Sequence, residues 1–218
     1  VQAVASGCDL AAEDVRCFYE WFADTGRTVT AFSQGINQSV AGTDKANAII
    51  NCHLATGRVG LPGASPFSLT GQPNAMGGRE VGGLANTLAA HMDYDTPGAM
   101  LRVSDFWHSE QMAKGPGHKA VELFEAVHRG EIRVLWVMGT NPAVSLPDTD
   151  RIHQALSRCQ TLIVSDCVAQ TDTTQFADIL LPAAGWGEKD GTVTNSERRI
   201  SRQRRFLTLP EKVRPDWQ

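Results

Sequence analysis

The apolar residues of the amino-terminal part follow first a helical and then a strand-like period. Residues 10–24 carry one helical stripe, which predicts a helix with Asp9 as its cap and Gly26 at its end. Residues 28–33 mix threonine with apolar side chains and predict a strand. A second helical pattern covers residues 44–56. The first stripe has the spacing i, i+3, i+4 and i+7 and consists of Val15, Phe18, Tyr19 and Phe22.

The middle of the chain lacks a sustained period. A polar turn is expected at residues 34–38, directly after the predicted strand. Residues 58–79 are rich in glycine and proline, and an irregular segment of this length inside a compact domain is usually functional. Helices are expected near residues 80–92, 104–112 and 119–129.

The carboxyl-terminal half contains the clearest unit. Residues 132–138 (IRVLWVM) and 161–165 (TLIVS) are runs typical of buried strands, with a helix expected near residues 149–158 between them. A strand, a crossover helix and a second strand predict a right-handed βαβ unit with a parallel sheet. Residues 177–181 (ADILL) predict a third parallel strand. The fold class is therefore α/β, with a mixed or parallel sheet and flanking helices.

Composition and charge exclude several classes of protein. The 218 residues are 42% hydrophobic and 20% charged, which argues against a disordered chain. The net charge of -4 gives no reason to expect nucleic acid as a partner. No apolar run reaches the roughly 18 residues of a membrane span, so no membrane partner is expected. Five cysteines without a C-x-x-C spacing are typical of reduced thiols and predict a cytoplasmic protein with no metal ligands in this chain.

Polar side chains follow two of the predicted strands. Asn141 comes after the first strand, and Ser165 and Asp166 end the second. Ligands of open parallel sheets bind beyond the carboxyl ends of the strands, and a carboxylate there can accept hydrogen bonds from a ribose or a guanine edge. In the alternative interpretation, Asp166 caps the next segment and Asn141 forms an Asn-Pro turn. Both interpretations remain open at this point.

Basic side chains outside these strand ends suggest anion binding only weakly. Lys189 lies in a predicted turn, where it could neutralise a phosphate or be solvated. Arg79 and Gln72 lie in the Gly/Pro-rich segment, where an arginine could bind an oxyanion or be an exposed loop charge. The remaining cluster is expected to be a solvated or domain-contact strip and consists of Arg198, Arg199, Arg202, Arg204 and Arg205.

Long motifs resemble those of the molybdopterin oxidoreductase family, and most closely its assimilatory nitrate reductases. They cover nearly the whole chain and are GINQSVAGTDKANAIINCHLATGRVGLPG, PFSLTGQPNAMGGREVGG, VLWVMGTNP, LIVSDC, ADILLPAAGWGEKDGTVTNSERR and the closing PDW. The resemblance implies a bis-molybdopterin guanine dinucleotide molybdenum cofactor and a [4Fe-4S] cluster. It also implies reduction of nitrate to nitrite.

The same resemblance implies roles for individual residues. Gln34 and Gln38 would face the pterin, although the related periplasmic enzymes carry Met at the position of Gln34. Gln72 and Arg79 would lie in the funnel to the metal, where Arg79 would orient nitrate. The guanine dinucleotide arm would be held by Asn141, Ser165, Asp166, Lys189 and Asp216.

The resemblance further implies that the chain is an internal piece of a longer enzyme. None of its five cysteines matches the ligands of the cluster or of molybdenum in the family. We expect residues 1–80 to end one α/β domain with the funnel loop, and residues 81–218 to be part of a Rossmann-like domain. The isolated piece should show no turnover. Ferredoxin, flavodoxin or an NADH-dependent reductase subunit would donate electrons. A formate dehydrogenase of the same superfamily and a non-catalytic nucleotide-binding module remain alternatives.

Overall fold

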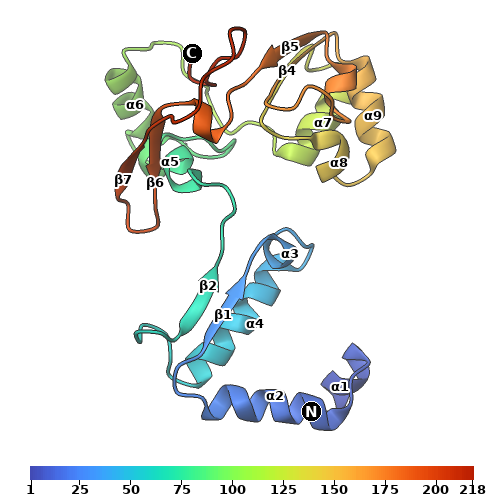
Figure 1. Ribbon diagram of the computed structural model, residues 1–218, viewed down its shortest axis with the longest axis vertical. Coiled ribbons are helices and arrows are strands. Elements are labelled where there is room, and N and C mark those ends of the chain that lie inside the picture. Colours follow the sequence, from blue (N-terminus) through green and yellow to red (C-terminus); the bar gives the residue numbers. More distant parts are fainter. The chain divides into compact units, whose positions relative to one another are not determined.

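The structure is a computed structural model that describes residues 1–218 (Figure 1). It divides into two compact units, Val1–Gln72 and Pro73–Gln218. The predicted domain boundary near residue 80 concerns the whole protein and stays a prediction, but within this chain helix α5 (Ala75–Glu80) belongs to the second unit. None of the helices combines the length and the apolar character that crossing a membrane requires.

The first unit pairs two short parallel strands beside helices. The strand β1 and the helices α2 and α4 confirm the predicted elements, because their apolar periods were sustained over whole turns. The pairing of β1 with β2 runs from Val29 opposite Ser65 to Phe32 opposite Ser68. The elements of this unit are α1 (Gln2–Cys8), α2 (Ala12–Asp24), β1 (Val29–Phe32), α3 (Gln34–Asn37), α4 (Gly42–Ala55) and β2 (Ser65–Ser68).

Three expectations for this unit are wrong. Asp9 does not cap α2, because its backbone is left-handed and it ends α1 instead. The residues after β1 form the short helix α3 and not a turn. The Gly/Pro-rich segment is not wholly irregular, because it contains the strand β2, which pairs in parallel with β1. Of the predicted apolar stripe only Val15 is buried, while Phe18 and Tyr19 are exposed.

A buried histidine and a buried arginine hold the first unit together. His53 of α4 is fully buried, and its Nε2 lies 2.8 Å from Oγ1 of Thr30 on β1. Arg58 donates hydrogen bonds to the carbonyls of Phe22 and Ala23 at the end of α2, the second at 2.8 Å. These carbonyls have no partner within the helix, and the carboxyl end of a helix favours a cation.

The second unit is built around a three-stranded parallel sheet with the order β3-β4-β5. A separate antiparallel hairpin, β6-β7, follows the sheet. The elements of this unit are α5 (Ala75–Glu80), η1 (Ala89–His91), α6 (Ala99–Trp107), α7 (Ala120–His128), β3 (Val134–Met138), α8 (Pro142–Ser145), α9 (Thr149–Arg158), β4 (Thr161–Asp166), η2 (Thr174–Phe176), β5 (Ile179–Pro182), η3 (Trp186–Glu188), β6 (Gly191–Thr194) and β7 (Ile200–Gln203).

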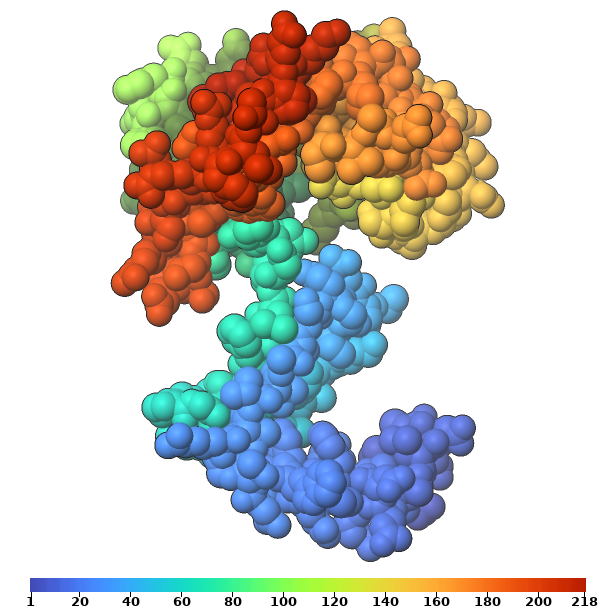
Figure 2. Space-filling model, viewed as in Figure 1, coloured from blue at the N-terminus to red at the C-terminus, as the bar shows by residue number.

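The α/β fold class, the parallel sheet and the flanking helices are confirmed in this unit. Along β3, Leu135 and Val137 are buried while Trp136 is half exposed, so one face of the strand packs on the core. The buried core combines these residues with apolar positions of α7, α9 and β4. In Figure 2 residues 140–180, coloured from yellow to orange, form one continuous rounded part of this unit.

Two of the three helices expected before this sheet differ from the prediction. The stretch 80–92 holds only the end of α5 and the single turn η1, because left-handed residues such as Gly82 and Ala90 interrupt it. The helix expected at 104–112 is α6, which begins earlier and ends at Trp107. The third expected helix, α7, is confirmed.

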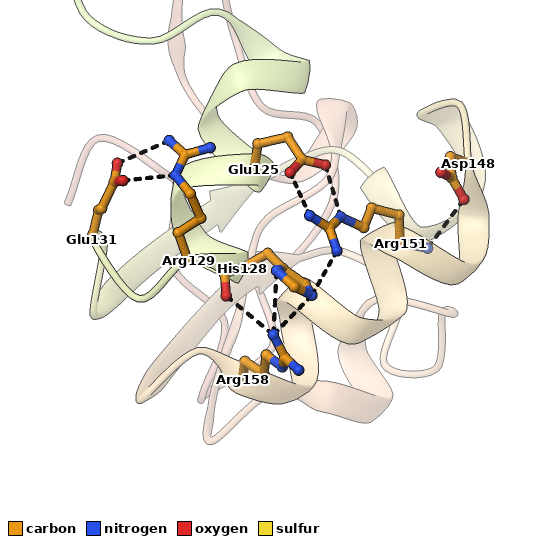
Figure 3. A network of polar contacts seen from close by, with 7 residues as sticks. All are labelled: Glu125, His128, Arg129, Glu131, Asp148, Arg151 and Arg158. Carbon is orange, nitrogen blue, oxygen red and sulfur yellow. Dashed lines mark hydrogen bonds and ion pairs between the residues drawn. The ribbon is translucent and has the colours of Figure 1, made fainter.

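A polar network joins the outer sides of α7 and α9 (Figure 3). Arg151 donates to both oxygens of Glu125, at 2.9 and 2.7 Å. The Arg151 hydrogen bonds hold the pKa of the Glu125 carboxyl below its usual range. Arg151 and Arg158 each approach Nε2 of His128 at 2.9 Å. Since both arginines can only donate, that nitrogen is an acceptor in this arrangement.

Candidate functional site at the sheet edge

The carboxyl ends of the parallel strands bring the predicted residues of the second unit to one edge of the sheet. Ser165 lies opposite Met138 of β3, and Asp166 ends β4 opposite Pro182 of β5. Asn141 lies beyond the end of β3 and immediately precedes α8. The expectation that parallel strand ends would gather these residues is therefore met.

Asn141 forms hydrogen bonds with Thr173 in the connection between β4 and β5. Its Oδ1 accepts hydrogen bonds from the backbone N and the Oγ1 of Thr173, at 3.1 and 2.6 Å. Thr173 is fully buried and its Oγ1 also lies 3.2 Å from the backbone N of Ala143. The carbonyl of Asn141 accepts from Val144 in the turn that starts α8. The turn interpretation is thus correct for Asn141, whose side-chain oxygen is already engaged within the chain.

Ser165 is buried, and the indole Nε1 of Trp136 donates to its Oγ at 2.9 Å. This hydrogen bond links β4 to β3 on one face of the sheet. The serine oxygen is therefore engaged as an acceptor within the chain, beside the backbone pairing that holds β4.

Asp166 is the strand-end residue whose side chain keeps binding capacity. Its Oδ1 accepts from the backbone N of Val168 at 2.9 Å, which is the predicted capping contact. Its Oδ2 forms no hydrogen bond within the chain, and the residue borders a cavity of about 210 Å³. A carboxylate can accept bonds at both oxygens. Capping and ligand binding are thus compatible at this position. The cavity is also lined by Cys167, Ala169, Leu180, Pro182, Ala183, Glu188, Pro210 and Val213.

Lys189 and Asp216, two candidates far apart in sequence, form an ion pair. Lys189 Nζ lies 2.7 Å from Oδ2 of Asp216. The last residues of the chain reach Lys189 because they run beside the segment after β5, where Ala183 and Arg214 form a parallel bridge. The indole of Trp217 also donates to the carbonyl of Asp190, at 3.2 Å. The ammonium of Lys189 therefore has a defined partner at a partly exposed position, and both alternatives for its role stay predictions.

A polar segment between β4 and β5 was missed by sequence reasoning. Residues 169–175, except the buried Thr173, border a second, open cavity of about 540 Å³. The available signal was the run AQTDTTQ, in which amides, hydroxyls and a carboxylate stand between two apolar strands. The lining residues are Ala169, Gln170, Thr171, Asp172, Thr174 and Gln175.

Arg79 on α5 is an exposed cation without an acidic partner. Its neighbour Glu80 does have partners: Arg198 Nε lies 2.9 Å and His91 Nε2 lies 3.4 Å from Glu80 Oε1. The hydrogen bond from Arg198 holds the pKa of the Glu80 carboxyl below its usual range. The negative charge of Glu80 is thus compensated, while the guanidinium of Arg79 has no partner and is available to bind an anion.

The glutamine candidates belong to the first unit. Gln34 opens α3 at the carboxyl end of β1, and Gln38 follows the helix. Ser33 donates to the carbonyl of Leu69 at 2.8 Å, which ties the start of α3 to the end of β2. Gln34 and Gln38 make no side-chain hydrogen bond within the chain, and neither does Gln72, which is exposed at the end of this unit. The three amides are therefore free to bind a ligand.

Metal-ligand chemistry is sparse in residues 1–218. No three side chains of histidine, cysteine, aspartate or glutamate gather where they could hold an ion. The five cysteines are separate and unpaired, with Cys8 and Cys167 exposed.

Comparison with known proteins adds to this geometry. The sequence model of the family described as molybdopterin oxidoreductase matches residues 10–218. A nitrate reductase of Klebsiella oxytoca is 57% identical over 98% of this chain and 25% of its own length. A nitrate reductase of Shewanella frigidimarina is 54% identical over 92% of this chain and 21% of its own length. The periplasmic nitrate reductase of Desulfovibrio desulfuricans is 36% identical over 98% of this chain and 29% of its own length.

The chain thus spans between a fifth and a third of the length of these relatives. The family match extends over both compact units and includes every candidate residue at the sheet edge, on α5 and at the end of β1. The chain belongs to the molybdopterin oxidoreductase family.

Proposed function

We propose that this chain is a segment of an assimilatory nitrate reductase, in which nitrate is reduced to nitrite. The reaction takes up two electrons and two protons and releases one water for each nitrate reduced. Support comes from the similarity to nitrate reductases over nearly the whole chain. The observation that carries the proposal is the state of α5: Arg79 is exposed and free of an acidic partner, while Glu80 beside it is compensated by Arg198.

Arg79 suits nitrate for a physical reason. A guanidinium presents a planar fork of N–H donors that can bond two oxygens of a planar oxyanion at once. A carboxylate paired with Arg79 would compete with the substrate for these donors. The side chain of Arg79 forms no ion pair within the chain, and the charge of the adjacent Glu80 is compensated by Arg198, so the arginine keeps its donors for the anion. Gln72, at the end of the first unit, offers an amide donor and stays a candidate for binding nitrate.

The cofactor in this proposal is a bis-molybdopterin guanine dinucleotide molybdenum centre, and Asp166 fits its guanine end. The free Oδ2 of Asp166 at a cavity matches the N–H edge of guanine, which donates two parallel hydrogen bonds to a carboxylate. Lys189 and Asp216 would bind phosphate and ribose groups of the same arm, in exchange for part of their ion pair. Asn141 and Ser165 would act mainly by holding the strand ends in place.

Gln34 and Gln38 would bond the pterin, whose ring carries both donors and acceptors, since an amide side chain offers both. When bound, the molybdenum centre supplies the two-electron oxygen-atom transfer, and this chain's residues supply binding, orientation and electrostatics. A [4Fe-4S] cluster would take its ligands from outside residues 1–218.

The assimilatory type rests on the resemblance of the long motifs of this chain to those of assimilatory nitrate reductases. An assimilatory enzyme would work in the cytoplasm. Its electrons would come from ferredoxin, flavodoxin or an NADH-dependent reductase subunit. Neither a membrane nor nucleic acid is part of the proposal.

Substitution of Arg79 in the holoenzyme that contains this chain tests the proposal. R79A should raise the KM for nitrate at least about tenfold, the loss expected for a charged hydrogen bond to the substrate. R79K should keep part of the affinity, because it retains the charge without the fork. Arg102, an exposed arginine on α6, provides the control R102A. An R79A enzyme with the nitrate kinetics of R102A would contradict the assigned role.

A further inference from the structure

Helix α5 is fastened at both ends to the β6-β7 hairpin. At its start, Oδ1 of Asn74 accepts from the backbone N of Thr194 at 3.0 Å. At its end, Glu80 Oε2 accepts from Arg198 Nη2 at 3.0 Å, and Glu80 Oε1 lies 2.9 Å from Arg198 Nε. The contact to Oε2 is a hydrogen bond, and the contact to Oε1 is an ion pair, so the guanidinium lies close to both oxygens of the carboxylate.

These ties matter because α5 and the hairpin are not closely packed between them. A cavity of about 370 Å³ lies there, lined by Gly77, Gly78, Glu80, Val81, Asn74, Thr192, Thr194, Arg198 and Ile200. The polar contacts at its two ends therefore link the helix to the hairpin on this side. Arg79, which does not line this cavity, is carried by the same six-residue helix.

The hairpin turn holds Arg198 in a defined direction. Its backbone is left-handed, with φ of 60°, a conformation that costs a non-glycine residue about 1 kcal/mol or more. Asn195 supports the turn, because its Oδ1 accepts from the backbone N of both Glu197 and Arg199 at 3.0 Å. Arg199, next in sequence, is exposed and makes no ion pair. Only one of these two adjacent arginines therefore reaches α5.

We propose that Arg198 is a positioning residue for the nitrate-binding Arg79: it ties Glu80 to the hairpin and cancels the negative charge beside the substrate arginine. This inference rests on the proposed function. Without Arg198, the Glu80 carboxylate keeps an uncompensated negative charge one residue from Arg79, and this charge repels an approaching anion. The effect falls on nitrate binding, since Arg198 itself makes no contact with the substrate in this account.

The test compares R198A, R198K, the double variant R198A/E80Q and the control R199A in the holoenzyme. R198A should raise the KM for nitrate about three- to fivefold, the size expected for one uncompensated surface charge, and change kcat less than about twofold. R198K should recover most of the affinity. R198A/E80Q should recover part of the affinity, because the uncompensated carboxylate is gone while the contact between α5 and the hairpin is still missing. A purely structural role would not allow this second recovery.

Hydrogen exchange measures the contact between Arg198 and Glu80 independently of activity. Amides of residues 75–83 should exchange faster in R198A and in R198A/E80Q than in R199A. If R198A leaves the KM and this exchange equal to those of R199A, or if the double variant stays as impaired as R198A, the inference is overturned. Should the wild-type holoenzyme fail to reduce nitrate, the proposed function falls. The tie is then still judged by exchange alone: faster exchange in R198A supports it, and equal exchange refutes it.

Discussion

Nε2 of His53 on α4 and Oγ1 of Thr30 on β1 are 2.8 Å apart, and the histidine is fully buried. Burial, aided by the charge of Arg58, lowers the pKa of His53. The unfolded chain therefore binds a proton more readily than the folded chain. The resulting contribution to stability is complete above the unfolded pKa of about 6.5 and is lost as the pH falls below it.

Replacing His53 should remove this pH dependence. H53Q should lower the free energy of unfolding at pH 7.5 and flatten its decline between about pH 6.5 and 5. Urea unfolding followed by circular dichroism across this range measures the effect. His118, which is exposed, supplies the control H118Q. If the free energy of unfolding has the same pH slope in wild type and H53Q, the burial of His53 does not cause the pH dependence.

Glu125 and Arg151 should stabilise the contact of α7 with α9. The pKa of Glu125 is lowered by the hydrogen bonds from Arg151. Its contribution is therefore present above the unfolded pKa and is lost as the pH falls through the folded pKa. E125Q should be less stable than wild type at pH 7, with a difference that shrinks toward pH 3. The control E131Q breaks the pair with Arg129, whose side chains are about half exposed, and should lose less. If E131Q loses as much stability as E125Q, the stabilising role of the Glu125–Arg151 pair is contradicted.

Gly77 has no side chain and so leaves room for the side chain of Asn74, which precedes α5. A Cβ at Gly77 would lie 2.2 Å from Oδ1 of Asn74, the atom that accepts from Thr194. G77A should therefore displace the Asn74 side chain, break its hydrogen bond with Thr194 and make the second unit about 1 kcal/mol less stable than G78A does. Gly78 on the same helix has open space at its Cβ, so G78A should be neutral or slightly stabilising. Chemical unfolding of both variants measures the difference, and equal stabilities would refute the contact.

Asp166 should control the content of guanine nucleotide. D166N replaces one oxygen with a donor and so removes an acceptor for the guanine edge. Acid release of guanosine monophosphate from purified holoenzyme should yield clearly less nucleotide from D166N than from wild type. Asp150, exposed on α9, provides the control D150N. Full nucleotide content in D166N would overturn the role of Asp166 in cofactor binding.

Local patterns predicted the elements whose signals lie close together in sequence. Helix α9 has the predicted bounds because Asp148 accepts from the backbone N of Arg151 at its start. Helix α5 was not predicted, since Gly77 and Gly78 suggest a loop and its ties come from residue 194 and beyond. The exposure of Phe18 and Tyr19 shows that a helical stripe identifies a face without identifying what covers it.

The candidate site was predictable where residues follow strands. Asp166 and Asn141 were located from the strand ends alone, because parallel strands end at the same edge. The pairing of Lys189 with Asp216 joins residues 27 positions apart, and no local period encodes it. The same holds for Glu80 and Arg198, which are 118 positions apart. Such pairs depend on the tertiary path of the chain.

The central claim is tested most directly by the product that the holoenzyme forms from nitrate. With a chemically reduced viologen as electron donor, the account predicts one nitrite formed for every two electrons consumed. It also predicts that R79A loses this activity at low nitrate and regains part of it at high nitrate. An enzyme that forms no nitrite and instead oxidises formate, or that performs neither reaction, would contradict the account.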